Sequence, residues 1–115
     1  MESLPALSFV YVTAPGKNEA LAIGRVLVEE RLAACINVFE GMSSVYHWQN
    51  AIEEATEAVL IAKTRTSLVP AVIARVKTLH PYTCPCVVSW PLHDGNPDYL
   101  QWLAAETRGE ESRKV

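Results

Sequence analysis

Apolar and polar residues along the chain follow two different periodicities, and their order predicts the fold. Short apolar and β-branched runs predict strands, and apolar residues at three- and four-residue spacing predict amphipathic helices. The predicted strands are residues 7–13, 35–48, 52–64 and 86–90, and the predicted helices are residues 17–34, 67–80 and 97–107. Pro70 suits the first turn of the second helix, and Pro81 ends it.

The second and third strands are predicted to form an unusually long hairpin. Gly41 interrupts the first arm, which indicates a bulge or bend, and Gln49 and Asn50 form the turn. Typical strands have about 5–6 residues, so arms of this length should project beyond a compact core. The apolar residues of the arms then need a partner chain to cover them.

The order β-α-β-β-α-β followed by a helix predicts an α+β fold, the ferredoxin-like split βαβ sandwich with an antiparallel sheet. Two helices cover only one face of such a sheet. Coverage of the other face by a second copy of the chain is the simplest physical solution, so a homo-oligomer is predicted.

Length, charge and cysteine content narrow the class of protein. The 115 residues suffice for one domain, residues 1–115, with an ordered core at about 7–107 and a frayed tail at 108–115. A net charge of −3 without a basic cluster argues against nucleic-acid binding. No apolar run approaches the roughly 20 residues that span a bilayer, and no signal peptide is recognised, so a cytoplasmic protein without membrane contact is expected. Three cysteines favour free thiols over a disulfide framework.

Several motifs resemble the CutA family of divalent-ion tolerance proteins. They are Tyr11-Val12-Thr13-Ala14-Pro15, Glu29-Glu30-Arg31-Leu32-Ala33-Ala34-Cys35-Ile36-Asn37, Ser44-Val45-Tyr46-His47-Trp48, Lys63-Thr64, Leu79-His80-Pro81-Tyr82 and residues 95–103, GNPDYLQWL. Their order and spacing are kept across nearly the whole chain. The resemblance implies a ferredoxin-like protomer, a homotrimer and a link to copper and other divalent cations. It also implies an architecture similar to the PII signalling proteins, and no catalytic reaction.

The chain departs from the family pattern at positions that bear on metal binding. A cysteine proposed as a copper ligand in some members is Val12 here, and a histidine pair is reduced to Leu79-His80. Only His80 therefore carries over from that copper site. Cys86 replaces the acid that usually follows the next proline.

The residues His80, Cys84 and Cys86 form the predicted metal site. An imidazole and two thiols lie within one short loop, and such ligands suit copper and Zn(II). The alternative is structural: His80 then caps its helix, and the two cysteines are small buried apolar residues. No cofactor is required in either case, and copper or another divalent cation is the candidate ligand.

A second candidate site is an inter-subunit cleft lined by Trp48, Lys63, Tyr82 and Trp102. Lys63 ends a buried strand, where a charge is costly unless it is paired. An interface salt bridge to Glu53, Glu54 or Glu57 is one reading, and a small-anion pocket closed by aromatic rings is the other.

These observations predict a non-enzymatic homotrimer that binds divalent cations, copper among them, and takes part in tolerance to them. No phosphate-binding glycine loop, catalytic triad or paired-carboxylate pattern is present. The alternative is a PII-like signalling or scaffold trimer that binds a small ligand or a partner protein at its clefts.

Overall fold

The computed structural model describes residues 4–108 and has the predicted order of elements with one added turn of 3-10 helix, η1. The elements are β1 (Leu7–Ala14), α1 (Lys17–Glu29), β2 (Cys35–Trp48), β3 (Ala51–Arg65), η1 (Thr66–Leu68), α2 (Val69–Leu79), β4 (Val87–Pro91) and α3 (Pro97–Glu106). Of the tail predicted at residues 108–115, only Arg108 lies within the described residues.

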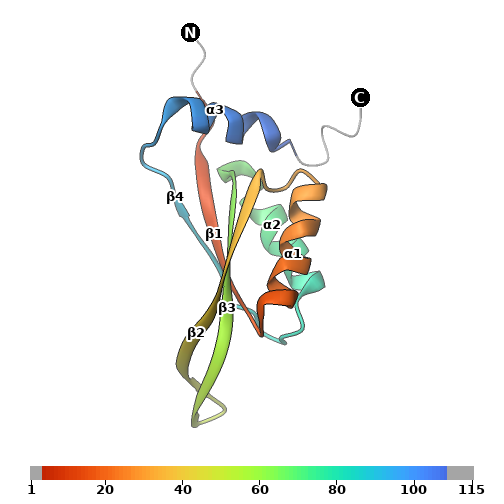
Figure 1. Ribbon diagram of the computed structural model, residues 1–115, viewed down its shortest axis with the longest axis vertical. Coiled ribbons are helices and arrows are strands. Elements are labelled where there is room, and N and C mark those ends of the chain that lie inside the picture. The colour runs from red at the N-terminus through yellow and green to blue at the C-terminus, as the bar shows by residue number, and fades with distance from the viewer. Residues whose placement is uncertain (1–3, 109–115) are drawn as a thin grey trace.

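The four strands form one antiparallel sheet in the order β2-β3-β1-β4. Strands joined by a helix are therefore separated by another strand, as the split βαβ pattern requires. Both α1 and α2 pack on the same face of the sheet, whereas α3 lies across one of its ends (Figure 1). The α+β prediction with an antiparallel sheet and three helices is confirmed.

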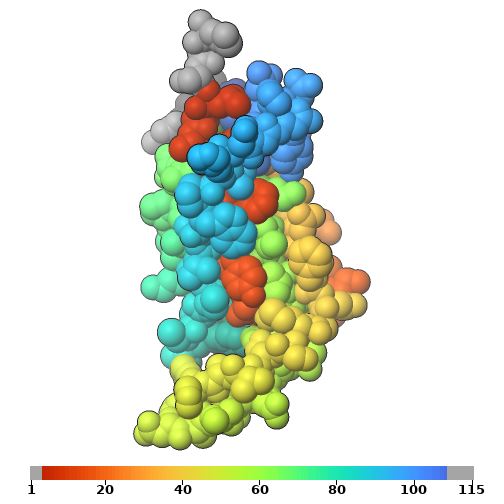
Figure 2. Space-filling model, turned by 90° about the vertical axis from the view of Figure 1, so that its left-hand side faces the viewer, coloured from red at the N-terminus to blue at the C-terminus, as the bar shows by residue number. Residues whose placement is uncertain are grey.

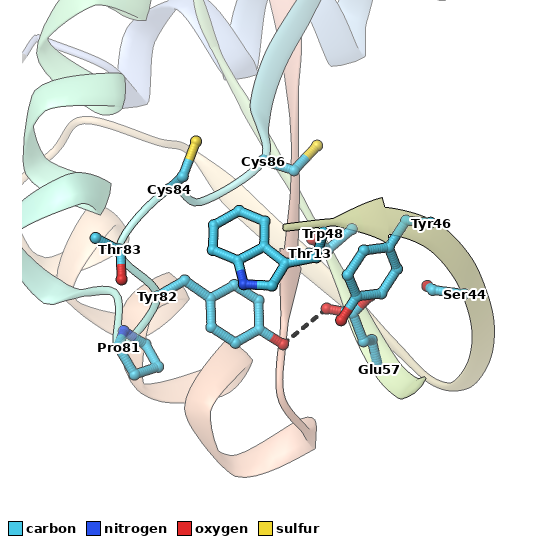
Figure 3. Close-up of a pocket in the computed structure, with 10 residues that line it drawn as sticks. All are labelled: Thr13, Ser44, Tyr46, Trp48, Glu57, Pro81, Tyr82, Thr83, Cys84 and Cys86. Carbon is cyan, nitrogen blue, oxygen red and sulfur yellow. Dashed lines mark hydrogen bonds between the residues drawn. The ribbon is translucent and has the colours of Figure 1, made fainter. Parts of the chain in front are cut away.

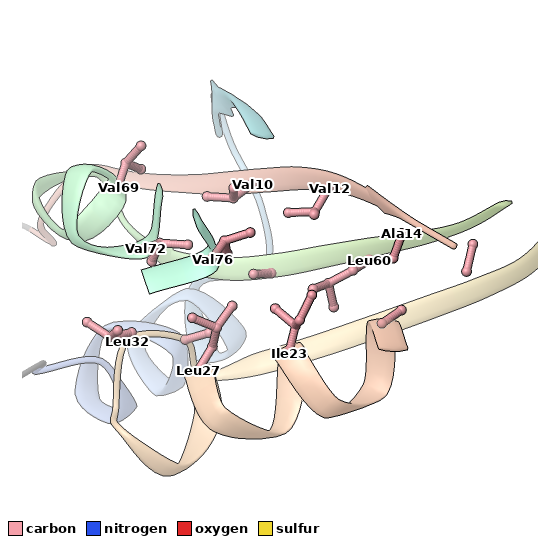
Figure 4. Packing of buried hydrophobic residues seen from close by; sticks show 14 residues of the cluster. Val10, Val12, Ala14, Ile23, Leu27, Leu32, Leu60, Val69, Val72 and Val76 are labelled. Carbon is pink, nitrogen blue, oxygen red and sulfur yellow. The ribbon is translucent and has the colours of Figure 1, made fainter. Parts of the chain in front are cut away.

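The main core lies between the sheet and the two helices that cover it (Figure 4). Its largest fully buried members come from four elements: Val10, Val12, Leu27, Leu60, Val72 and Val76. Alternate residues of β1 and β3 point into this core because successive side chains of a strand face opposite ways.

The first helix ends earlier than predicted, at Glu29 and not at residue 34. Arg31 adopts a left-handed conformation with φ 62°, which no α-helix continues. The backbone N–H groups of Leu32 and Ala33 then both donate to the Leu27 carbonyl oxygen, at 2.9 and 3.1 Å. Apolar residues keep a helix-like spacing through this turn, so the sequence pattern predicted a helix that is too long at its C-terminal end.

The predicted bulge at Gly41 is confirmed, and it reverses the orientation of the side chains that follow. Phe39 pairs with Val59, and the next aligned pair is Met42 with Glu57, so β2 contains one extra residue. Gly41 has φ 79°, a region that glycine enters without steric cost. Side chains at even positions after Gly41 consequently share the sheet face of the odd positions before it.

Beyond the bulge, β2 and β3 form a two-stranded arm. Strand β1 stops pairing at Ala14, opposite Ala58, so no third strand accompanies the hairpin further. Gln49 and Asn50 turn the chain with φ 51° and 65°, which confirms the predicted turn. The molecule is therefore elongated, 54 × 30 × 22 Å, with the arm at the end opposite α3 (Figure 1).

Side chains fix α3 at its end of the sheet. Leu103 and Ala104 pack against Leu7 of β1. The Asn96 side chain accepts a hydrogen bond from the Asp98 N–H, at 3.2 Å, and caps the helix start. Near the helix end, the Arg65 guanidinium donates to the Ala104 carbonyl oxygen, at 2.7 and 3.1 Å.

No described helix covers the second face of the sheet, which we call the open face (Figure 2). Side chains of β1 (red) appear there between those of β4 (blue) and β3 (green). Large apolar side chains remain accessible on this face, among them Phe39 (60% exposed), Val88 (53%) and Trp90 (41%). The face is thus apolar and uncovered within a single chain.

Candidate functional site

A pocket lies where the hairpin arm, the end of β1 and the loop between α2 and β4 meet. Its volume is about 530 Å³. The lining residues are Thr13, Ser44, Tyr46, Trp48, Glu57, Pro81, Tyr82, Thr83, Cys84 and Cys86 (Figure 3). The β2 side chains in this set lie at alternate positions after the bulge, so the bulge decides which residues reach the pocket.

Glu57 and Tyr82 connect the arm to the loop. The Tyr82 hydroxyl donates a hydrogen bond of 2.8 Å to Glu57 Oε2, drawn as a dashed line in Figure 3. Glu57 is only 8% exposed, and it lines the pocket. Burial, together with the hydrogen bond to Glu57 and its negative charge, raises the pKa of Tyr82 to about 12. Tyr82 therefore remains a neutral hydrogen-bond donor across the physiological range.

His80 is engaged at both ring nitrogens and holds the loop in place. Its Nε2 lies 2.6 Å from the Thr13 carbonyl oxygen, and its Nδ1 lies 3.1 Å from the Tyr82 backbone N–H. Since the Tyr82 N–H must donate to Nδ1, the ring proton sits on Nε2 and is donated to Thr13. His80 is 8% exposed, and its ring packs against the Tyr82 ring, with 4.7 Å between centroids. No ring nitrogen is left with a free lone pair for a metal.

Cys84 and Cys86 are both free and exposed at the edge of the pocket. In Figure 3 their sulfur atoms point away from the Tyr82 hydroxyl. Partial desolvation of the Cys86 sulfur, followed by the charge of Glu57, raises the pKa of that thiol, which disfavours the thiolate that metals require.

The predicted set His80, Cys84 and Cys86 is not assembled into a three-ligand site within one chain. Residues 4–108 contain no group of three or more His, Cys, Asp or Glu side chains placed to hold a metal ion. The hydrogen bonds of His80 favour its structural reading. Cys84 and Cys86 are accessible, not buried as that reading supposed.

Within one chain, the four residues predicted to line an inter-subunit cleft lie in two regions, and the cleft itself stays a prediction. They are Trp48, Lys63, Tyr82 and Trp102. Trp48 and Tyr82 line the pocket, whereas Lys63 and Trp102 lie beside α3. Lys63 lies six positions after Glu57 along the extended strand β3, which places them in different regions of the sheet.

Lys63 is held by aromatic groups. Its Nζ donates to the Tyr99 hydroxyl at 3.1 Å and lies 5.5 Å from the ring centroids of both Phe9 and Tyr99. Trp102 packs on Tyr99, with 5.6 Å between centroids. Within the part of the chain that the structure describes, Lys63 has no ion pair with a carboxylate. The predicted salt bridge joins Lys63 to Glu53, Glu54 or Glu57 of a neighbouring subunit, so it stays a prediction.

Sequence reasoning missed two contributors to these regions. Tyr46 lies in the pocket with Trp48, and Tyr99 is the partner of Lys63. The two-residue spacing of Tyr46 and Trp48 on a strand, and the three-residue spacing of Tyr99 and Trp102 on a helix, were signals that each pair shares a face.

The motifs that resembled CutA are matched by a family model. The model, described as CutA1 divalent ion tolerance protein, matches residues 8–106. The chain belongs to the CutA1 family. Within residues 4–108, none of the helices has the length and apolar character needed to cross a bilayer.

Relatives from distant organisms agree with this assignment. The divalent-cation tolerance protein CutA of Thermus thermophilus is 46% identical over 98 residues, which is 85% of this chain and 95% of that protein. Human Protein CutA is 41% identical over 102 residues, which is 89% of this chain but only 57% of the human protein. The crystal structure of CutA1 from Oryza sativa superimposes with a TM-score of 0.90 at 38% identity, covering 93% of this chain and 98% of that one. CutA1 is not known as a family of enzymes.

Proposed function

We propose that this CutA1 member is a non-enzymatic homotrimer that takes part in tolerance to divalent cations and binds them, copper included, at its exposed thiols. The observation that carries the proposal is the open face, because it needs a cover that one chain does not supply. The family's name supports the link to divalent cations.

The distribution of apolar side chains supports the assembly. Phe39, Val88 and Trp90 are exposed on the open face. Val45 (66% exposed) and Ile52 (69%) are exposed on the opposite side of the arm, so both sides of the hairpin carry accessible apolar side chains. Large apolar side chains that stay accessible in this number mark interaction surfaces. Arms that project beyond their own core can reach the open face of a neighbouring copy. Light scattering tests the proposal: the expected mass is that of three chains of 12.7 kDa, and a monomer would refute it.

The two exposed thiols support metal binding. Cys84 and Cys86 are separated by one residue and accessible, and soft thiolates bind Cu(I) and Zn(II). Remaining ligands would come from neighbouring chains, because one chain does not supply three. Metal binding at the two thiols is tested by a competition titration. The fully reduced, assembled protein is titrated with Cu(I) and Zn(II) against chelators of known affinity.

The variant Cys84→Ser/Cys86→Ser should lose tight stoichiometric binding in this titration. Cys35→Ser is the matched control, since Cys35 is free but lies at the start of β2, outside the pocket lining. Unchanged affinity in the double variant, or equal loss in Cys35→Ser, would contradict the assignment.

A second function, PII-like binding of a small ligand or partner protein, is favoured by the pocket itself. Its volume, about 530 Å³, lies in the range of small-molecule sites, and aromatic and apolar groups line most of it. A ligand selective for the native state must raise Tm. Screening nucleotides, organic acids and amines by thermal shift therefore tests this function, and no shift with any of them would count against it.

We also propose a cytoplasmic location, supported by the three free thiols, which suit a reducing compartment. Fractionation of cells that express the full-length protein tests it, and recovery from another compartment would overturn it.

A further inference from the structure

Three aromatic rings and one carboxylate meet in the pocket. Tyr46 and Trp48 come from β2, Tyr82 from the loop after α2, and Glu57 from β3. Figure 3 draws the three rings in one group with the Glu57 carboxylate. Aromatic faces carry negative electrostatic potential, so several rings around a carboxylate create a site that attracts cations.

The charge of Glu57 is not neutralised by a neighbouring cation. Among residues 4–108 the side-chain ion pairs are Arg31–Glu106 and Arg75–Glu30, and neither involves Glu57. The lining of the pocket contains no lysine, arginine or histidine. Glu57 is 8% exposed and has no cation beside it, so a cationic ligand would supply a charge partner that the described residues do not.

Glu57 also retains hydrogen-bonding capacity. Tyr82 occupies Oε2, and Oε1 has no hydrogen-bond partner within residues 4–108. Glu19 lies near enough for its charge to contribute to the raised pKa of Tyr82, so the local field is negative beyond Glu57 alone.

We propose that the pocket binds a small organic ammonium ion, with the ammonium group paired to Glu57 and its alkyl part between the rings of Tyr46, Trp48 and Tyr82. This proposal gives a ligand class to the small-ligand function above and rests on it, and it is independent of metal binding at the thiols. An organic cation fits better than a bare divalent ion because Glu57 is the one carboxylate among the lining residues.

The test uses a matched pair of probes that differ in charge. Isoamylammonium and its alcohol analogue, 3-methylbutan-1-ol, share one carbon skeleton. Binding to the assembled wild-type protein is followed by calorimetry and by the indole N–H resonance of Trp48. The ammonium ion should bind once per chain and at least about ten-fold more tightly than the alcohol, since a desolvated ion pair and cation–π contacts are absent for the alcohol.

Variants assign the binding to named groups. Glu57→Gln should weaken ammonium binding about ten-fold, and Trp48→Leu should weaken it about three- to ten-fold. Glu29→Gln is the matched control and should bind as wild type. Glu29 is an exposed carboxylate at the end of α1, outside the pocket lining, so the variant removes one negative charge without touching the pocket.

Each remaining outcome overturns the proposal in a distinct way. Equal binding of amine and alcohol would leave a small-ligand pocket but remove its selectivity for cations. Unchanged binding in Glu57→Gln would place the amine elsewhere. No binding of either probe to wild-type protein would reject the ammonium site, while thermal shifts with nucleotides or organic acids would still decide the small-ligand function.

Discussion

The two faces of the sheet differ in whether one chain can complete them. On the face that α1 and α2 cover, Leu60 of β3 is fully buried among side chains from both helices. On the open face, Phe39 of β2 is 60% exposed and Trp90 of β4 is 41% exposed. The sheet therefore has a closed core on one face and an uncovered apolar surface on the other.

The composition of β3 shows that both faces are built for burial. Antiparallel sheets with one wet face alternate apolar and polar residues, whereas strands covered on both faces are continuously apolar. Residues 58–62 read AVLIA, without alternation. This pattern supports an assembly that covers the open face. Substitutions on the covered face should therefore act on folding, and substitutions on the open face should act on assembly.

The largest effect should come from the covered face. Leu60→Ala should lower the free energy of unfolding by about 2–5 kcal/mol, because it leaves a cavity in a closed core. Denaturant unfolding measures this change. Leu21→Ala is the matched control on the outer side of α1, where Leu21 is 40% exposed, and it should cost less than about 1 kcal/mol. Similar losses in the two variants would show that the covered face is not the stabilising core.

A charge on the open face should act on assembly. Phe39→Glu should reduce the proposed trimer to smaller species while each chain keeps its secondary structure, because a buried unpaired carboxylate disfavours the interface. Light scattering and circular dichroism measure the two effects. Leu21→Glu places the same charge on the outer side of α1 and should leave the mass unchanged. Retention of the trimer by Phe39→Glu would mean that the open face is not the interface.

A smaller effect should follow from crowding at Gly24, where α1 approaches the sheet. A Cβ added there would lie 2.8 Å from Ile36 Cδ1 and Cγ1 and 3.1 Å from Leu60 Cδ1. Gly24→Ala should cost about 1–2 kcal/mol, the strain exceeding the gain in helix propensity. In a double-mutant cycle, Ile36→Ala removes both close atoms and should relieve this cost. If the free-energy losses of Gly24→Ala and Ile36→Ala simply add, contact with Ile36 is not the source of the cost at Gly24.

The fold was predictable because local patterns and global order agreed. Apolar periodicity, Gly41 at the bulge and Gln49 with Asn50 at the turn each indicated the same topology. The end of α1 was not predictable from periodicity. The apolar residues after Glu29 are spaced like those of a helix, but the backbone that carries them turns back on itself.

The candidate site was predictable only in part. Residues near one another in sequence, such as His80, Cys84 and Cys86, looked like a ligand set, but the hydrogen bonds of His80 to Thr13 and Tyr82 depend on tertiary contacts. The partnership of Glu57 with Tyr82 joins residues 25 positions apart across the arm and the loop, and no local pattern encodes it.

The smallest effect expected is a pH dependence at the pocket end of the open face. The pKa of Tyr82 is raised from 10.0 to about 12, so the folded state retains this proton where the unfolded state has lost it. Stability contributed by the neutral phenol is fully present below pH about 10 and is lost as pH rises toward about 12. In urea unfolding, Tyr82→Phe should therefore lose less stability than wild type between pH about 10 and about 12.

An absorbance titration of the tyrosines measures the same effect directly. The phenolate that forms at the highest pH should be absent in Tyr82→Phe. In Glu57→Gln it should form at lower pH, because this variant removes the charge and weakens the hydrogen bond. If no tyrosine of the wild-type protein ionises at such high pH, the hydrogen bond between Tyr82 and Glu57, which joins the loop to the arm at the pocket, would be refuted.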